Sequence, residues 1–307
     1  MIRVRFHGRG GQGVKTAGRV LGTAALLDGF TAQDSPVYGA ERRGAPMTAY
    51  VRIAREAIFE RGAIPSPHLV VVADDTLLDD PSVKPLAGLE PRGVLLIATS
   101  HSAEEVRQHT GHPGPVVARD FVALALEQIG SAAGVSTAVA SAACALHGLS
   151  VEALVRALHA ELGAIGLSAG QIQAGLRLAE AARAGIGRVE FPDLAAPSLR
   201  AGSPVVDVTY APPEMGAPTV TAKPNTPLRK TGNWRVFRPV IALDQCTQCW
   251  ICFVRCPEGA IELDPEENPY VDYEVCKGCL ICIEECPTGA ITKVREVREW
   301  APAEAVS

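Results

Sequence analysis

Eight of the nine cysteines in this 307-residue chain fall into two runs of identical spacing. The runs are Cys246-x2-Cys249-x2-Cys252-x3-Cys256-Pro257 and Cys276-x2-Cys279-x2-Cys282-x3-Cys286-Pro287. This pattern is typical of bacterial proteins that bind two [4Fe-4S] clusters, because soft thiolates suit iron and the short gaps let one loop bind three corners of a cluster. The runs therefore predict a module that carries electrons.

The cysteines divide into two sets of four ligands. In this pattern the fourth cysteine of each run binds the cluster of the other run. We therefore assign one cluster to Cys246, Cys249, Cys252 and Cys286, and the second to Cys276, Cys279, Cys282 and Cys256. Each proline then directs the chain away from the cluster and removes a backbone donor.

Two other uses of these cysteines are weaker explanations. Zinc sites usually take their ligands from two separated pairs, whereas each run here has three closely spaced cysteines and one before proline. Four disulfides would require an oxidising compartment. The start of the chain, Met1-Ile-Arg-Val-Arg-Phe, has no apolar segment with a cleavage site like that of a signal peptide, so we expect a cytoplasmic protein.

The similarity between the two runs extends beyond the ligands. CPEGAIEL, starting at Cys256, and CPTGAITK, starting at Cys286, occupy the same position in the two repeats. Such internal similarity predicts that residues 233–307 fold as one α+β ferredoxin-like unit with pseudo-twofold symmetry.

Charge and composition limit the possible partners. The net charge is −5, and residues 241–307 contain 13 acidic and 5 basic residues, a net charge of −8 that leaves +3 for residues 1–240. An acidic cluster-binding end disfavours nucleic acid and suits a redox partner with a basic docking patch. Hydrophobic residues make up 47% of the chain but form no apolar run long enough to span a membrane, so we expect no membrane partner.

The sequence predicts three parts. Residues 1–190 alternate short apolar runs with Ala-rich stretches, which indicates a Rossmann-like α/β domain. Prolines are frequent from 192 to 239, and we interpret residues 191–232 as a linker. Expected strands cover 2–6, 30–33, 48–53, 69–73 and 94–98, and expected helices cover 14–27, 121–128, 137–146, 151–162 and 169–182.

A glycine-rich loop follows the first predicted strand and opens the first predicted helix. Such a loop allows a tight turn and close approach of a phosphate, and the helix N-terminus supplies free N–H groups. Asp34 ends the second predicted strand, where an acid that binds a dinucleotide ribose would stand. We discount this nicotinamide interpretation because Ser35-Pro36 follows and residues 37–48 read as a functional loop. The candidate cofactor-binding glycines are Gly8, Gly10, Gly11 and Gly13.

Four further residues are candidates for a functional or structural role. Arg42 and Arg43 lie in the predicted functional loop, where a cleft-facing role competes with that of an ordinary solvated loop. Cys144, in SAACALHG, is expected to be a buried small hydrophobe on a helix. His7, at the end of a strand, is expected to be structural.

Two groups of segments carry a family resemblance. GRGGQGVKTAGRVL, starting at Gly8, and DSPVYGAERRGAPMTAYVRI, starting at Asp34, resemble the gamma subunit of the 2-oxoacid:ferredoxin oxidoreductases, the pyruvate:ferredoxin oxidoreductase family. GNWRVFRPVIALDQCTQCWICFVRCPEGAI and VDYEVCKGCLICIEECPTGAI are similar to the delta subunit of that family. The chain resembles a fusion of the two subunits.

This resemblance implies oxidative decarboxylation of a 2-oxoacid on thiamine diphosphate and Mg, acyl transfer to coenzyme A, and release of two electrons through [4Fe-4S] clusters to ferredoxin. The family's Gly-Asp-Gly thiamine motif is absent from this sequence, which implies that thiamine is bound by alpha- and beta-type partner subunits. Ser136 stands where related gamma chains tend to have Asn, and we expect it to be the N-cap of the helix.

Together these features predict a gamma-delta subunit in which a docking domain is joined to an exit route for electrons. We assign no catalytic residue to this chain itself. Two alternatives stay open: an NAD-dependent oxidoreductase with a fused ferredoxin domain, and a non-catalytic electron carrier with a docking module.

Overall fold

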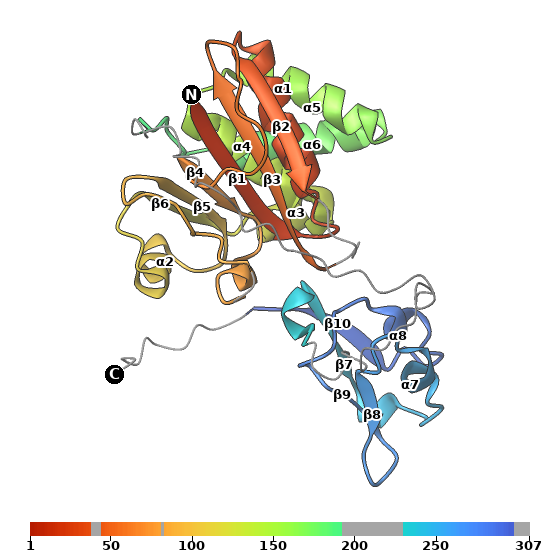
Figure 1. The fold of residues 1–307 in the computed structure, drawn as a ribbon. Coiled ribbons are helices and arrows are strands. Elements are labelled where there is room, and N and C mark those ends of the chain that lie inside the picture. Colours follow the sequence, from red (N-terminus) through yellow and green to blue (C-terminus); the bar gives the residue numbers. More distant parts are fainter. Residues whose placement is uncertain (38–43, 81–82, 192–229, 298–307) are drawn as a thin grey trace, which may run out of the picture.

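The computed structural model describes residues 1–37, 44–80, 83–191 and 230–297. They form an N-terminal α/β domain and a smaller cysteine-rich domain (residues 230–297), which lies beyond one end of the large sheet (Figure 1). The candidate residues Arg42 and Arg43, and most of the predicted linker, lie outside the described residues.

A six-stranded mixed sheet in the order β2-β3-β1-β4-β5-β6 forms the centre of the N-terminal domain. Strands β1, β4, β5 and β6 run parallel, whereas β3 is antiparallel to both β1 and β2. The strands are β1 (Ile2–Arg9), β2 (Thr31–Val37), β3 (Pro46–Ala54), β4 (Leu69–Val72), β5 (Val94–Ala98) and β6 (Val116–Arg119). The predicted α/β class is confirmed, and the antiparallel β3 departs from a purely parallel Rossmann sheet.

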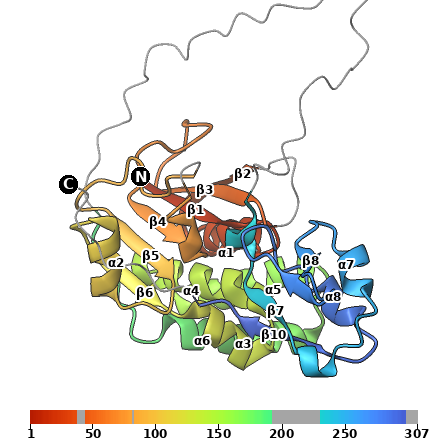
Figure 2. The same cartoon turned by 90° about the horizontal axis from the view of Figure 1, so that it is seen from below.

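Most helices cover one face of this sheet (Figure 2). Their apolar faces form a single core with residues of β1, β3, β4 and β5. This core includes Phe6 of β1 and the helix residues Leu21 and Leu158. The opposite face carries a smaller core beneath α2 (Ala103–Thr110), centred on Val72 and Val106. The helices of the main layer are α1 (Val14–Leu27), α3 (Phe121–Ile129), α4 (Val135–His147), α5 (Val151–Ala164) and α6 (Ala169–Arg183).

Buried polar side chains alternate along β1 on the face opposite α1. Arg5 donates from Nε to His7 Nε2 at 2.9 Å and from Nη1 to the carbonyl oxygen of Ile64 at 3.0 Å. Arg3 forms an ion pair with Glu60 at 2.6 Å. These contacts hold irregular segments over the sheet and satisfy charges that would otherwise be costly to bury. His7 is therefore structural, as predicted.

The cysteine-rich domain consists of two small sheets and two short helices. Strand β7 (Phe237–Ile241) pairs with β10 (Ile291–Arg295), and β8 (Ile261–Leu263) pairs with β9 (Pro269–Val271), both antiparallel. Helices α7 (Ile251–Arg255) and α8 (Ile281–Glu284) pack against each other. Each helix occupies the same place in its repeat, so the domain has the predicted ferredoxin-like organisation.

Helix α4 begins upstream of the start that we expected, and Ser136 is not its N-cap. Its N-cap is Gly134 and its first residue is Val135, so Ser136 lies inside the first turn. The Ser136 hydroxyl instead donates to the carbonyl oxygen of Ala133 at 3.1 Å. A 3-10 helix over Ala132–Gly134, capped by Ser131, runs directly into α4, so helical structure starts before Ser136. No helix among the described residues has the length and apolarity needed to cross a membrane.

Candidate functional site

The two cysteine loops share one backbone geometry. A residue in the left-handed region precedes each helix, Trp250 at φ 55° before α7 and Leu280 at φ 64° before α8. A second left-handed residue lies between the first two cysteines of each run, Gln248 at φ 51° and Gly278 at φ 68°. These positions turn the chain sharply between successive cysteines of each run.

The structure brings together the first crossed set of cysteines. Cys246, Cys249 and Cys252 of the first run line a small cavity with Cys286 of the second run. Backbone N–H groups also approach the sulfurs, as between Gln248 N and Cys246 Sγ at 3.4 Å. N–H groups of this kind stabilise a thiolate that binds iron.

The second crossed set lies around Cys282. Burial, and secondarily the neighbouring thiols of Cys279, Cys276, Cys256 and Cys252, raise the pKa of Cys282 to about 12. Three of these neighbours are the proposed co-ligands of the second cluster. Crowded thiols in a half-buried loop can all ionise only beside a cation, which is what cluster iron supplies.

The cysteines supply the donor set that [4Fe-4S] clusters require. Within the described ranges, no group of three His, Cys, Asp or Glu side chains is close enough to hold one metal ion. A [4Fe-4S] cluster does not need such a group, because each of its four cysteines binds a different iron atom. All eight cysteines of the two runs are free thiols, so the donor set is complete.

The glycine loop is packed tightly against its own domain. A Cβ on Gly8 would collide with Val14, and one on Gly13, at φ 74°, would lie 2.7 Å from Ser136 Oγ. Gly10 N donates to the carbonyl oxygen of Ala45 at 2.8 Å. The glycines thus permit close packing, and one of the N–H groups expected to face a ligand is already used.

The sheet order contradicts the nicotinamide interpretation. Asp34 lies in the middle of β2, which continues to Val37, and pairs with Val51 of β3; Val51 in turn pairs with Val4, near the start of β1. In a dinucleotide-binding fold the acid ends the strand next to β1, beside the glycine loop. Here β3 separates β2 from β1, so Asp34 is far along the sheet from that loop.

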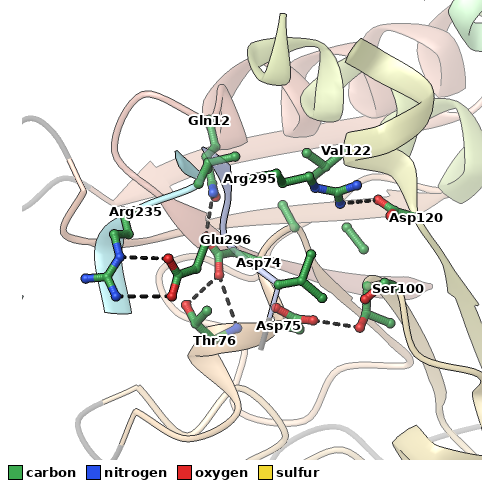
Figure 3. A pocket seen from close by; sticks show the side chains of 15 residues that line it. Gln12, Asp74, Asp75, Thr76, Ser100, Asp120, Val122, Arg235, Arg295 and Glu296 are labelled. Carbon is green, nitrogen blue, oxygen red and sulfur yellow. Dashed lines mark hydrogen bonds and ion pairs between the residues drawn. The ribbon is translucent and has the colours of Figure 1, made fainter. Parts of the chain in front are cut away.

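The carboxyl edge of the sheet carries a buried polar network (Figure 3). Gln12 donates from Nε2 to Asp74 at 2.6 Å and accepts from Arg9 N at 2.7 Å. Arg9 Nη2 donates to the hydroxyl of Thr76 at 2.6 Å. Thr76 Oγ1 in turn lies 3.0 Å from the carbonyl oxygen of Asn233. The network therefore joins the glycine loop to the cysteine-rich domain.

Charged residues strengthen this junction on its other side. Arg295, at the end of β10, donates to Asp120, which is the N-cap of α3 and accepts from Ala123 N at 2.8 Å. Burial would raise the pKa of Asp120, but the hydrogen bonds from Arg295 and Ala123 outweigh it and lower the pKa. Arg235 pairs with Glu296 at 2.9 Å and holds β7 and β10 together at this edge (Figure 3).

A larger cavity of about 370 Å³ lies between the domains. Gly10 and Gly11 line one wall, and Trp234, Lys277 and Cys279 line the other. The second cysteine loop thus faces the glycine loop, a proximity that neither motif predicts from its own residues.

Sequence reasoning missed the junction residues. Asp120 directly follows β6, and Asp74 and Thr76 lie in the first residues after β4. Polar residues after parallel strands meet at the carboxyl edge of a sheet, and this signal was available. Trp234 and Arg295 had no comparable signal, because only the docking of the two domains gives them their partners.

Family models match both domains of the chain. The model of the family described as pyruvate ferredoxin/flavodoxin oxidoreductase matches residues 3–185, and that of the 4Fe-4S dicluster domain matches residues 245–290. The chain is 44% identical over 131 residues to the common gamma subunit of pyruvate/ketoisovalerate oxidoreductases from Pyrococcus furiosus, covering 42% of this chain and 70% of that protein. It is 39% identical over 159 residues to pyruvate synthase subunit PorC of Methanothermobacter marburgensis, covering 51% of this chain and 84% of that protein.

A solved structure supports the same relationship. The crystal structure of pyruvate oxidoreductase subunit PORC from Thermotoga maritima aligns with a TM-score of 0.51 and 33% identity, covering 59% of this chain and 94% of that one. That alignment extends over most of the smaller protein, and the first family model covers more than half of our chain. The chain therefore belongs to the pyruvate ferredoxin/flavodoxin oxidoreductase family, and a 4Fe-4S dicluster domain follows the family domain in the same polypeptide.

Proposed function

We propose that this chain is the fused gamma-delta subunit of a cytoplasmic 2-oxoacid:ferredoxin oxidoreductase complex, with pyruvate among the candidate substrates. The complex would convert a 2-oxoacid and coenzyme A to acyl-CoA and CO2. The single observation that carries the proposal is the presence of both matched domains in one chain, with the second cysteine loop facing the gamma-type domain.

We assign the eight cysteines to two [4Fe-4S] clusters in the crossed arrangement. Support comes from the cavity shared by Cys246, Cys249, Cys252 and Cys286, and from the crowding around Cys282. Bound clusters would supply one-electron transfer, and ferredoxin or a similar protein would be the acceptor. The cysteine loops of this chain would hold the clusters, limit access of water and supply N–H groups to the sulfurs.

Thiamine diphosphate and Mg would be bound by alpha- and beta-type partner subunits, since the chain lacks a Gly-Asp-Gly sequence. Coenzyme A is the expected co-substrate. Within the glycine loop, Gly11 is the residue that we expect to contact an anion, because it lines the interdomain cavity together with Lys277 and Lys293. Gly8, Gly10 and Gly13 would then act mainly by shaping the loop.

The test is expression of the chain with the products of its neighbouring genes, followed by anaerobic purification. We expect thiamine-binding subunits to copurify, with about eight iron atoms per copy of this chain, and the complex to reduce ferredoxin when given a 2-oxoacid and coenzyme A. A chain that purifies alone with full iron content and no 2-oxoacid activity would indicate an electron carrier instead. Stoichiometric zinc after anaerobic purification would refute the cluster assignment.

A further inference from the structure

The two cysteine loops, although related by pseudosymmetry, have different surroundings. Gly278 of the second loop packs so closely on β7 that a Cβ would collide with Arg235 and lie 2.5 Å from the carbonyl oxygen of Phe237. Gln248 occupies the equivalent position in the first loop and is exposed. The second loop therefore faces inwards, to the domain junction, and the first loop faces solvent.

The side chains of the first loop form an exposed apolar surface. Trp250, Phe253 and Val254 are 38%, 44% and 75% exposed. In the second repeat the equivalent residues are Leu280, Ile283 and Glu284. Leu280 and Ile283 are half-buried, and Glu284 is charged. We call Trp250, Phe253 and Val254 the outer face; it lies on and beside α7, at the outer edge of the cysteine-rich domain in both views (Figures 1 and 2).

Trp250 connects this surface to the interior of the cluster loop. It lines the same cavity as Cys246, Cys249, Cys252 and Cys286. Its indole Nε1 donates to the carbonyl oxygen of Glu267 at 3.1 Å, which fixes the ring at the surface. A fixed aromatic side chain is a low-entropy anchor for a protein interface.

Acidic residues surround the outer face. Glu266 and Glu267 are exposed, and their backbone is held against the loop by the hydrogen bonds from Gln248 and Trp250. Residues 241–275 contain eight acidic residues and one basic residue, Arg255. A basic partner would therefore be attracted and oriented at this face, and the attraction would weaken as salt is added.

We propose that the outer face docks a soluble one-electron carrier protein whose own docking surface is basic at its rim and apolar at its centre. This proposal rests on the cluster assignment within the proposed function. The exchange at this face is the loss of one electron by the chain and the gain of one by the partner, and no bond forms or breaks. Electrons come from 2-oxoacid oxidation in the complex and from dithionite in the test.

The test uses the full anaerobically purified chain and cytochrome c, a basic one-electron haem protein, as the probe. Binding is measured by biolayer interferometry over a range of salt concentrations, and reduction of the haem by stopped-flow absorbance. Phe253→Ser combined with Val254→Ser removes most of the apolar centre and leaves Trp250, which lines the cluster cavity, in place. Glu266→Lys combined with Glu267→Lys reverses the acidic rim.

We expect each double variant to weaken binding at least tenfold with unchanged iron content, and the Lys variant to lose most of the salt dependence. Matched controls on the N-terminal domain, Phe59→Ala at an 87% exposed aromatic and Glu56→Lys at an exposed acid, should bind normally. Equal losses in the controls, unchanged binding by both outer-face variants, or no salt-dependent binding by the unmodified chain would overturn the proposal. Because no 2-oxoacid or partner subunit is present, these outcomes are independent of whether the complex oxidises a 2-oxoacid.

Discussion

Trp234 of the cysteine-rich domain occupies the space that Gly44 of the N-terminal domain leaves open. A Cβ built on Gly44 would lie 2.5 Å from Trp234 Cε3 and 3.1 Å from Trp234 Cβ. Gly44 also has φ 82°, a conformation that favours glycine, and its carbonyl oxygen accepts a hydrogen bond from Arg9 at 3.3 Å. The junction between the domains thus depends on the absence of one side chain.

Gly44→Ala should loosen this junction beyond its cost in backbone strain. Gly29 provides the control, because it has φ 85° and nothing within 4 Å of its Cβ position. We expect Gly29→Ala to lower the free energy of unfolding by about 1 kcal/mol, and Gly44→Ala by about 1–3 kcal/mol more. The measurement is denaturant unfolding followed by circular dichroism and by visible cluster absorbance. Equal effects of the two substitutions would mean that Trp234 adapts without cost.

The crossed ligand assignment predicts selective loss of each cluster. Cys286→Ser should damage the cluster held by the first run, and Cys256→Ser the cluster held by the second. Electron paramagnetic resonance of the reduced chain, together with iron analysis, distinguishes the two. Cys144→Ala is the control, since Cys144 is fully buried in α4 and should leave the iron content unchanged. Loss of the second cluster alone in Cys286→Ser would contradict the assignment.

The buried His7 should make stability depend on pH. Burial, and secondarily the charge of Arg5, lower the pKa of His7 from 6.5 to about 3. Below pH 6.5 the unfolded chain binds a proton that the folded chain excludes, so the free energy of unfolding falls as pH decreases towards 3. The contribution of this one group is at most about 1.4 kcal/mol per pH unit. In His7→Gln, stability measured between pH 7 and pH 5 should therefore decrease less steeply; parallel curves would show that His7 is protonated in the folded chain.

The contact between Asp120 and Arg295 should contribute modestly, because both side chains are partly exposed, at 27% and 28%. A double-mutant cycle with Asp120→Asn and Arg295→Gln is expected to give a coupling free energy of about 0.5–1 kcal/mol. Asp120→Asn retains a residue that is favourable as an N-cap, so the cycle isolates the contact between the domains. A coupling near zero would show that Arg295 is placed by β10 alone.

The sequence predicted local elements better than their assembly. The helix from Val14 to Leu27 matched its prediction, since a glycine-rich start and an unbroken periodic apolar pattern define it. Helix α2 was missed because Val106 is its only buried residue, although Ser102 and Glu105 form a capping box that could have revealed it. The position of β3 between β1 and β2 was beyond reach, because it depends on pairing between distant segments.

The candidate site shows the same division. The spacing of the cysteines predicted two crossed sets of ligands because the pattern is local and repeated, and the members of the first set line one cavity in the structure. The ligand-binding role of the glycine loop stays a prediction, while its tight packing was not foreseen: the Gly10 N–H donates to Ala45, and Gly8 and Gly13 lie against Val14 and Ser136. Only the folded structure places that loop opposite the second cysteine loop.

The contacts of Thr76, Gly44 and Asp120 are few, so by themselves they would form a weak interface between separate proteins. Here the two partners belong to one polypeptide, and Phe191 and Lys230 are joined by the intervening chain. A covalent connection of this kind gives an effective concentration on the order of millimolar. A junction with even a submillimolar intrinsic dissociation constant would then be closed most of the time, independent of how much protein the cell makes. Because the two domains are fused, the cysteine-rich domain stays docked on the N-terminal domain without a high-affinity interface between them.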